Sequence, residues 1–388
     1  MRILHIAETA QGGVGTYLNE MVPLQNEALG AVNLRVLLPR QHSAQVPDLL
    51  PEQVITFDRS SRRAGLSKLA VALIRALSEW RPDVVHAHST FAGAVARMLA
   101  WWPGMPPIVY CPHGWVFEVE QSRGSHWATR TAERLLSHGS ARIVAISESE
   151  HRQALAAGIA ESRLVRVTNG MRDLGVPVEP ADWPVSGDAS TLRILFVGRL
   201  DRQKGVDVLL EALRGLSGGY HLRVAGAQVL AGSQASDDSA NLPIEWLGWL
   251  SQVDVARQLA ACDLVVMPSR WEGMPLAAIE AMRASKPVIA SAVGGLPELI
   301  VDGLTGRLVP ADDPIALRTA IKAHSREVLA AMGHAARVRY QLNYTRRRTH
   351  AGLMALYEEV LSQPAKTSAH SSSRHPDPLS APSRSNQP

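Results

Sequence analysis

Two acids, Glu272 and Glu280, flank the start of an apolar helix predicted at 275–285. Glu272 follows the short apolar run 264–267 in a loop, and the helix opens on a proline, which suits a first helical position. Free N–H groups at a helix start bind anions, and a carboxylate on an apolar helix is costly unless it is hydrogen-bonded. Together these groups could hold a polar group, a phosphate and a diol, the parts of a nucleotide sugar. Alternatively, Glu280 pairs with a base in the core and Glu272 is a solvated loop acid.

Two cations, Arg199 and Lys204, stand between a predicted strand at 193–197 and a predicted helix at 206–216. Ligands of open α/β sheets bind outside the carboxyl ends of the strands, where this loop must lie. A guanidinium offers phosphate oxygens a fork of donors, and an ammonium offers a point charge. Either residue alone indicates an exposed loop charge, whereas the two together could bind the oxygens of a diphosphate.

Two further strands end in loops that carry polar or flexible residues. Strand 108–111 leads to His113, and strand 3–7 leads to Gly12 and Gly13. A glycine loop lets the backbone approach a ligand closely. Neither the dinucleotide nor the P-loop glycine pattern fits it, which argues against NAD and P-loop chemistry. The alternative for the glycine loop is a tight strand–helix turn, and the alternative for His113 is a loop histidine without a role.

His86 and His88 alternate along a predicted strand at 83–89 and have the side chains of metal ligands. No third ligand stands near them in the sequence. We therefore expect His88 to hydrogen-bond at the strand end and His86 to lie in the core, and we expect no metal site.

The residues described so far resemble those of the family 4 glycosyltransferases, a retaining group with GT-B architecture. Glu272 and Glu280 fit its E-x7-E pattern, and 198–205 fits G-R-L-x-x-x-K-G. The flanking segments 293–298 (Val-Gly-Gly-Leu-Pro-Glu) and 302–306 (Asp-Gly-Leu-Thr-Gly) also look like the family. The E-x7-E pattern is weak alone and strong in this context. The resemblance implies an α/β fold with two Rossmann-like, doubly wound domains that face a central cleft.

The resemblance also assigns the candidate site. It implies catalytic roles for Arg199, Lys204, His113 and Glu272, with His113 against the transferred sugar and Glu272 on its hydroxyls. Glu280 would accept hydrogen bonds from the ribose. The implied donor-binding residues are Gly12, Gly13, Arg199, Lys204, Gly226, Glu272, Gly273, Met274, Pro275, Leu276 and Glu280.

The expected reaction needs no metal and no cofactor beyond the nucleotide-sugar co-substrate. GT-A transferases usually hold Mg²⁺ or Mn²⁺ with a D-x-D motif, which this chain lacks. Positioned cations and N–H donors can instead stabilise the leaving diphosphate. No carboxylate can be assigned as a covalent nucleophile, so a front-face mechanism fits the retention that the resemblance implies. A GT-B sugar-nucleotide epimerase and an inactive sugar-nucleotide-binding scaffold are the alternatives.

The chain of 388 residues is long enough for two domains with full cores. We expect an acceptor-binding domain at 1–175, a linker at 176–190 and a nucleotide-sugar-binding domain at 191–345. A helix at 346–362 would return to the first domain, and 363–388 would be a disordered tail rich in Ser, Pro and His.

Composition and charge limit the classes of molecule that this chain is expected to bind. A formal charge of +4 is only mildly basic, and no nucleic-acid-binding signature is present. Cys111 and Cys262 stand far apart in apolar contexts, which indicates buried free thiols in a reducing compartment. We expect a UDP- or GDP-sugar donor and a glycan or polyprenyl-diphosphate-linked oligosaccharide acceptor, in surface polysaccharide assembly.

Membrane contact is the last expectation from the sequence. The N-terminal apolar run is too short for a signal peptide, and no apolar run approaches the ~20 residues of a membrane span. We expect a cytoplasmic chain, with at most peripheral contact with the membrane. Arg59, Arg62 and Arg63, together with Trp101 and Trp102, would form a basic and aromatic patch; the alternative is a solvated loop and a helix end.

Overall fold

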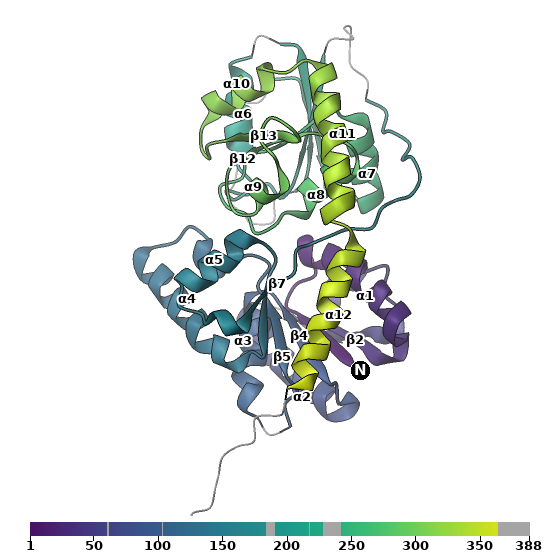
Figure 1. Cartoon of the computed structure of the whole chain (residues 1–388), viewed down its shortest axis with the longest axis vertical. Coiled ribbons are helices and arrows are strands. Elements are labelled where there is room, and N and C mark those ends of the chain that lie inside the picture. The colour runs from purple at the N-terminus through teal and green to yellow at the C-terminus, as the bar shows by residue number, and fades with distance from the viewer. Residues whose placement is uncertain (60–61, 103, 184–190, 217, 228–241, 364–388) are drawn as a thin grey trace, which may run out of the picture.

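The computed structural model describes most of the chain (Figure 1). The described residues are 1–59, 62–102, 104–183, 191–216, 218–227 and 242–363, with the side chains of 62–64 also left aside. Residues 228–241, part of the predicted linker and almost all of the predicted tail lie outside these residues.

In the described part of the chain, the first of two sheets has seven strands, all paired in parallel. They lie in the spatial order β3 (Val54–Phe57), β2 (Leu34–Pro39), β1 (Ile3–Ala7), β4 (Val84–His88), β5 (Ile108–Cys111), β6 (Arg142–Ala145) and β7 (Leu164–Arg166). The inner strands are mostly apolar and almost wholly buried, as parallel strands covered on both faces must be, and the buried histidines of β1 and β4 are among the exceptions to their apolar character. The accompanying helices are α1 (Gly13–Leu29), α2 (Arg62–Trp80), α3 (Thr90–Met98), α4 (Arg123–Leu136) and α5 (Glu148–Ala156).

Among the described residues, the second sheet has six parallel strands. Their spatial order is β10 (Ile244–Gly248), β9 (Tyr220–Ala225), β8 (Leu192–Val197), β11 (Leu264–Met267), β12 (Val288–Ser291) and β13 (Gly306–Val309). The helices of this half are α6 (Val206–Arg214), α7 (Gln252–Ala261), α8 (Leu276–Arg283), α9 (Leu296–Leu299), α10 (Pro314–Lys322), α11 (Arg326–Asn343) and α12 (Arg346–Ser362). Short 3-10 turns complete the described chain: η1 (Ala31–Asn33), η2 (Arg40–Gln45), η3 (Pro51–Gln53), η4 (Leu99–Trp101), η5 (Val116–Glu118), η6 (Ser137–Gly139) and η7 (Glu161–Arg163).

Both sheets have the strand order of a Rossmann fold, with a switch point between their first and fourth strands. The switch lies between β1 and β4 in the first sheet and between β8 and β11 in the second. Loops after these strands therefore border the places where such sheets bind ligands. The prediction of two Rossmann-like, doubly wound domains is confirmed.

The second domain returns to the first through its last two helices. Helix α11 lies beside the second sheet, and α12 continues down beside the first, where it packs against α1 (Figure 1). Tyr357 of α12 is fully buried there, and its Oη lies 2.6 Å from His86 Nδ1 of β4. The last helix thus completes the core of the first domain.

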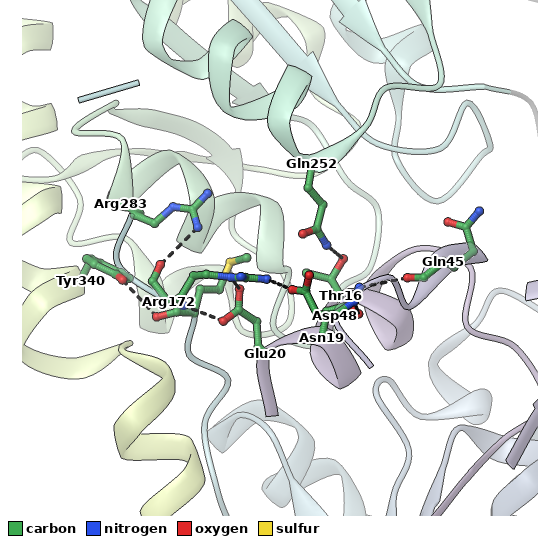
Figure 2. A network of polar contacts seen from close by, with 10 residues as sticks. Thr16, Asn19, Glu20, Gln45, Asp48, Arg172, Gln252, Arg283 and Tyr340 are labelled. Atoms are coloured by element: carbon green, nitrogen blue, oxygen red, sulfur yellow. Dashed lines mark hydrogen bonds and ion pairs between the residues drawn. The ribbon is translucent and has the colours of Figure 1, made fainter. Parts of the chain in front are cut away.

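A polar network ties the crossing segments together (Figure 2). Arg172, in the segment that leaves the first domain, pairs with Glu20 of α1 at 3.1 Å and also with Asp48. Arg283 of α8 donates to the Arg172 carbonyl at 3.2 Å, and Tyr340 of α11 donates to the Met171 carbonyl at 3.0 Å. The two domains are therefore joined by ion pairs and hydrogen bonds at the crossover.

Several helix ends differ from the sequence-based predictions. Helix α8 begins at Leu276, because Pro275 has extended backbone (φ −70°, ψ 123°) and is its N-cap. Helix α3 ends at Met98 and passes into the 3-10 turn η4. Strands β3 and β10, which the sequence did not indicate, lie at sheet edges, where half-exposed strands carry a weak hydrophobic signal.

Candidate active site

Lys204 and Glu272 form the centre of the candidate site. Lys204 Nζ lies 2.5 Å from Glu272 Oε1, and Ser269 Oγ donates to the same oxygen at 2.7 Å. The Glu272 side chain is only 5% exposed and that of Lys204 16%. Glu272 is therefore not a solvated loop acid. Two residues from separate loops, both predicted from the sequence, meet at one point.

The turn at Gly205 brings Lys204 to this position. Gly205 has a left-handed backbone (φ 65°), and a Cβ there would lie 2.1 Å from the Pro268 carbonyl oxygen. The stem of Lys204 crosses Gly198, with 3.4 Å from its Cγ to an ideal Cβ on that glycine. The glycines at both ends of this loop let it lie directly against the end of β11.

Arg199 is held from one side by neighbours in its own loop. Its Nε donates to Asp201 Oδ2 at 2.8 Å, and its Nη2 donates to Gln203 Oε1 at 2.6 Å. Gln203 in turn donates to the Trp271 carbonyl at 3.0 Å. The guanidinium has five N–H donors and its side chain is 43% exposed, so it can still bind an anion. The sequence analysis missed Asp201 and Gln203.

The loop before α8 is fixed by a pair of glycines. A Cβ on Gly294 (φ 55°) would lie 1.8 Å from the Glu272 carbonyl oxygen. The N–H of Gly295 donates to the Gly273 carbonyl at 2.7 Å. Because this backbone packing positions Gly273 and Met274, the N–H groups that open α8 at Leu276 lie beside Glu272. No side chain of the described residues caps this helix start, which leaves it suited to an anion.

Glu280 lies one turn into α8. Burial raises the pKa of Glu280 to about 7, opposed by the nearby charge of Arg283 and assisted by that of Glu20. Among the described residues, no cation comes within ion-pair distance of Glu280 and no side chain donates a hydrogen bond to it. The alternative of a core ion pair is therefore not what the structure has. An unpaired acid in this position can accept hydrogen bonds from a ligand.

His113 stands in the loop that follows β5 of the first domain. Its backbone is left-handed (φ 53°), its Nε2 lies 2.9 Å from His88 Nδ1, and its ring meets the edge of Tyr17 at 4.9 Å between centroids. Burial lowers the pKa of His113 to about 4, so the ring is neutral at pH 7.

The loops of His113 and Glu272 touch through Gly273. A Cβ on Gly273 would lie 2.6 Å from Glu150 Oε1 and 3.4 Å from the Gly114 nitrogen, both in the first domain. Burial raises the pKa of Glu150 to about 7, and its Oε1 has no hydrogen-bond partner among the described residues. The structure therefore brings the His113 loop and the Glu272 loop together, over a buried acid that the sequence analysis missed.

Two further missed residues join the domains beside the site. Glu298 of α9 accepts hydrogen bonds from the N–H groups of Glu148 and Ser149 at the start of α5. Asn169 Nδ2 donates to the Met274 carbonyl at 3.2 Å. Only their positions in the fold reveal them, since each partner is more than a hundred residues away.

The remaining predicted glycines fall in two places. A Cβ on Gly226 would lie 1.8 Å from the Gly198 carbonyl oxygen. Gly226 therefore packs against the start of the loop that carries Arg199 and Lys204. Gly12 is the N-cap of α1 and Gly13 its first residue, and a Cβ on either would have open space around it. The nearby Thr16 Oγ1 accepts a 3.3 Å hydrogen bond from Gln252 of α7 (Figure 2).

The histidines of β4 have a third neighbour that the sequence analysis did not find. His5 of β1 pairs in register with His86, and ring nitrogens of His5, His86 and His88 lie within 4.8 Å of one another. No third histidine is near His86 and His88 in the sequence, but His5 is near them in space. In the fold, three fully buried imidazoles lie together.

The structure describes part of the predicted basic and aromatic patch. Arg59 Nη1 donates to the Glu8 carbonyl at 2.6 Å, at the end of β1. The side chains of Arg62 and Arg63 lie outside the described residues. Trp101 and Trp102 are 66% and 65% exposed. The aromatic half of the patch is therefore at the surface, and its basic half stays a prediction.

Comparisons of the sequence identify the family of each half. Residues 12–170 match the family described as a glycosyl transferase 4-like domain, and 191–326 match glycosyl transferases group 1. An uncharacterized 41.2 kDa protein in the cps region of Klebsiella pneumoniae is 31% identical over 324 residues, which cover 81% of this chain and 87% of that protein. A D-inositol 3-phosphate glycosyltransferase of Mycobacterium marinum is 29% identical over 297 residues, 71% of this chain and 63% of that enzyme.

Solved structures share the fold. HepE from Anabaena, solved with UDP-glucose, superposes with a TM-score of 0.76 at 19% identity, covering 92% of this chain and 100% of HepE. The lipopolysaccharide outer core galactosyltransferase WaaB has a TM-score of 0.66 at 20% identity, covering 92% of this chain and 100% of WaaB. With both halves matched to glycosyltransferase families and a 31%-identical relative over most of its length, the chain belongs to the family 4 glycosyltransferases of GT-B architecture.

Proposed function

We propose that this enzyme transfers a hexose from a UDP- or GDP-sugar to a glycan or lipid-linked oligosaccharide in surface polysaccharide biosynthesis, with retention of configuration and without a metal. HepE binds UDP-glucose, WaaB is a lipopolysaccharide outer core galactosyltransferase, and the Klebsiella relative is encoded in a cps region. These relatives support the nucleotide-sugar donor and the polysaccharide setting.

One observation carries the proposal: the Lys204–Glu272 pair beside the open start of α8. Arg199, on the same loop as Lys204, adds a second cation with unused donors. Cations and helix N–H groups are what a leaving diphosphate requires as its negative charge grows. Glu272, held by Lys204 and Ser269, is placed to accept hydrogen bonds from the sugar of the same donor. A cation for the phosphate and an acid for the sugar thus stand side by side.

In the proposed reaction, the bond between the anomeric carbon and the diphosphate oxygen breaks. The acceptor oxygen bonds to that carbon on the same face, and its proton passes to the departing phosphate. Lys204, Arg199 and the N–H groups of α8 stabilise the leaving group. Protein charges therefore supply the electrostatic help that GT-A enzymes take from a metal. Glu280 accepts hydrogen bonds from the ribose, and His113 contacts the transferred sugar.

The two halves divide the work in this proposal. Residues 191–345 take the donor, 1–175 take the acceptor, 176–190 link them, and 346–362 belong to the acceptor half. An apolar cavity of about 300 Å³ lies between α2 and α3 of the first domain. Trp101, Trp102 and Trp127 are exposed on the same domain. This surface supports peripheral contact with a membrane that carries the acceptor. None of the described helices is both long and apolar enough to span a bilayer.

Thermal-shift measurements with UDP-, GDP-, ADP- and CMP-sugars in the presence of EDTA test the donor. We expect stabilisation by the UDP- or GDP-sugars only. Release of nucleoside diphosphate on addition of an acceptor then separates a transferase from a scaffold, which binds donor without releasing it. Conversion of the donor sugar without any acceptor would instead indicate an epimerase, and silence from every compound would contradict the proposal.

A further inference from the structure

A chain of three hydrogen bonds runs through the first domain to His113. Gln25 Oε1 of α1 lies 2.9 Å from His5 Nε2. His5 Nδ1 lies 2.9 Å from His88 Nε2, and His88 Nδ1 lies 2.9 Å from His113 Nε2. The chain therefore connects a buried amide to the histidine at the cleft through both nitrogens of each intervening ring.

Among the described residues, the rings of His5 and His88 have no hydrogen-bond partner outside this chain of hydrogen bonds. His5, His88 and Gln25 are 0% exposed, whereas His113 keeps partial exposure. His5 and His88 come from the adjacent strands β1 and β4, and His113 follows β5 on the other side of β4. A buried polar atom without a partner is costly, so each ring nitrogen must satisfy the next.

The number of protons on each ring determines which nitrogen donates and which accepts along the chain of hydrogen bonds. Burial lowers the pKa of His5 to about 4 and that of His88 well below its usual value, so both rings are neutral at pH 7. A neutral imidazole has one N–H and one acceptor nitrogen. Once one bond in the chain has a donor and an acceptor, the protons in every other bond follow.

Tyr357 sets that direction through Gln25. Tyr357 Oη lies 2.6 Å from His86 Nδ1 and receives the Gln25 amide N–H at 3.5 Å. If the tyrosine hydroxyl donates to His86, its oxygen accepts from Gln25, and Gln25 Oε1 is left to accept from His5. His5 then carries its proton on Nε2 and accepts at Nδ1.

We propose that His5 and His88 are positioning residues that, with Gln25, hold His113 as the Nε2–H tautomer and leave its Nδ1 to accept a hydrogen bond from a hydroxyl of the donor sugar. This inference rests on the proposed function, in which His113 contacts that sugar. A neutral acceptor does not oppose the positive charge that develops at the anomeric carbon, whereas an imidazolium would. The buried histidines therefore act on the reaction without touching the substrate.

A metal is the competing explanation for the cluster, because His5, His86 and His88 have ring nitrogens within 4.8 Å of one another. In the structure, His5 Nδ1 and His88 Nε2 are already bonded to each other. A metal held by these atoms would break that hydrogen bond. The hydrogen-bond chain and the metal site therefore exclude each other, and one experiment distinguishes them.

The tautomer can be measured directly by NMR of the full chain labelled with ¹⁵N-histidine, with His113 assigned by its loss in His113→Gln. We expect a protonated Nε2 and a bare Nδ1, unchanged by EDTA or added Zn²⁺. Gln25→Glu, whose carboxylate only accepts, retains this pattern, and Gln25→Leu gives a mixture of tautomers. A wild-type His113 protonated on Nδ1, a mixed signal, or a spectrum that changes with the metal overturns the proposal.

Steady-state kinetics of His88 variants test whether the hydrogen-bond chain affects sugar transfer. His88→Leu is expected to lower kcat by about tenfold, the worth of one hydrogen bond, with little change in the donor KM. His88→Asn puts an amide oxygen near the former Nδ1 and restores most of kcat. The control His221→Asn removes a histidine that accepts a hydrogen bond from Trp183 in the second domain, and leaves kcat unchanged. Wild-type kcat in a folded His88→Leu overturns the proposal. Should the wild-type enzyme neither bind donor nor transfer, the proposed function fails, while the NMR measurement still decides the tautomer.

Discussion

The carboxylate of Glu298 in the second domain accepts a 2.9 Å hydrogen bond from the N–H of Ser149 in the first. Its other oxygen accepts from the N–H of Glu148 at 2.8 Å. An acid at a helix start satisfies free N–H groups and complements the helix dipole. The side chain of Ser147, the N-cap of α5, accepts from the N–H of Glu150. Glu298 of the other domain accepts from the two N–H groups before it, so this carboxylate stabilises the contact between the domains.

Replacing Glu298 by Ala should therefore loosen domain contact and raise the donor KM. The expected loss of stability is about 1 kcal/mol, as for other helix caps, measurable by denaturant unfolding. Asp313→Ala is the matched control, because Asp313 caps α10 inside one domain through the N–H groups of Ile315 and Ala316. That variant should lose similar stability with an unchanged donor KM. Equal KM values in the two variants would contradict a role at the domain contact.

Lys204→Ala and Glu272→Ala should each reduce transfer by about a hundredfold or more without unfolding the protein, since each removes a charge from the reacting centre. Initial rates of nucleoside-diphosphate release measure the effect, and circular dichroism checks the fold. Arg202→Ala serves as the control, because its pair with Glu120 is exposed on both sides. Near-normal turnover in either site variant would refute the site assignment.

Donor binding should weaken as the pH falls through about 7. The pKa of Glu280 is raised to about 7, so below this pH the carboxyl is protonated and accepts hydrogen bonds less well. Calorimetric titration of donor between pH 6 and 8 measures the trend. Glu280→Gln should bind more weakly at pH 8 and lose the pH dependence in this window. A wild-type affinity that does not change with pH would show that Glu280 does not bind the donor as an anion.

Acid should destabilise the first domain through its histidines. The pKa of His86 is lowered well below its ordinary value of 6.5 by burial, and that of His5 to about 4. A histidine with a depressed native pKa binds protons mainly when unfolded, so stability falls as pH drops below about 6.5. For His5 the full effect at low pH is about 3 kcal/mol. His86→Asn keeps an acceptor for Tyr357 and should reduce the slope of unfolding free energy against pH between 6.5 and 4.5. An unchanged slope would contradict the neutral, buried state of His86.

Removal of divalent cations should leave transfer unchanged within about twofold, because Arg199, Lys204 and α8 stabilise the leaving group. Rates are compared after dialysis against EDTA and after addition of Mg²⁺ or Mn²⁺. A rate that collapses in EDTA and returns with one metal would refute metal-independent transfer.

The sequence predicted the features that depend on local pattern. Apolar runs followed by glycine, proline or charged loops placed Lys204 and Glu272 at strand ends, and parallel sheets bring such ends together. Glu298 and His5 escaped prediction for the opposite reason. The partner of Glu298 is 149 positions away at Ser149, and that of His5 is 83 positions away at His88. Glu298 ends a segment that resembles the family, but that resemblance assigned it no role. The roles of both residues arise from the packing of distant segments.

Synthesis of the chain on the ribosome begins with the strands of the first domain, yet the helix that closes its core is made near the end. Leu353 and Tyr357 of α12 are both 0% exposed, packed on elements built from the first ninety residues. Domains that fold during synthesis do so as their residues emerge, and this one must wait for almost the whole polypeptide. A fragment that stops at the interdomain linker should therefore expose apolar surface along α1, and the nascent protein should need protection from aggregation until its last helix arrives.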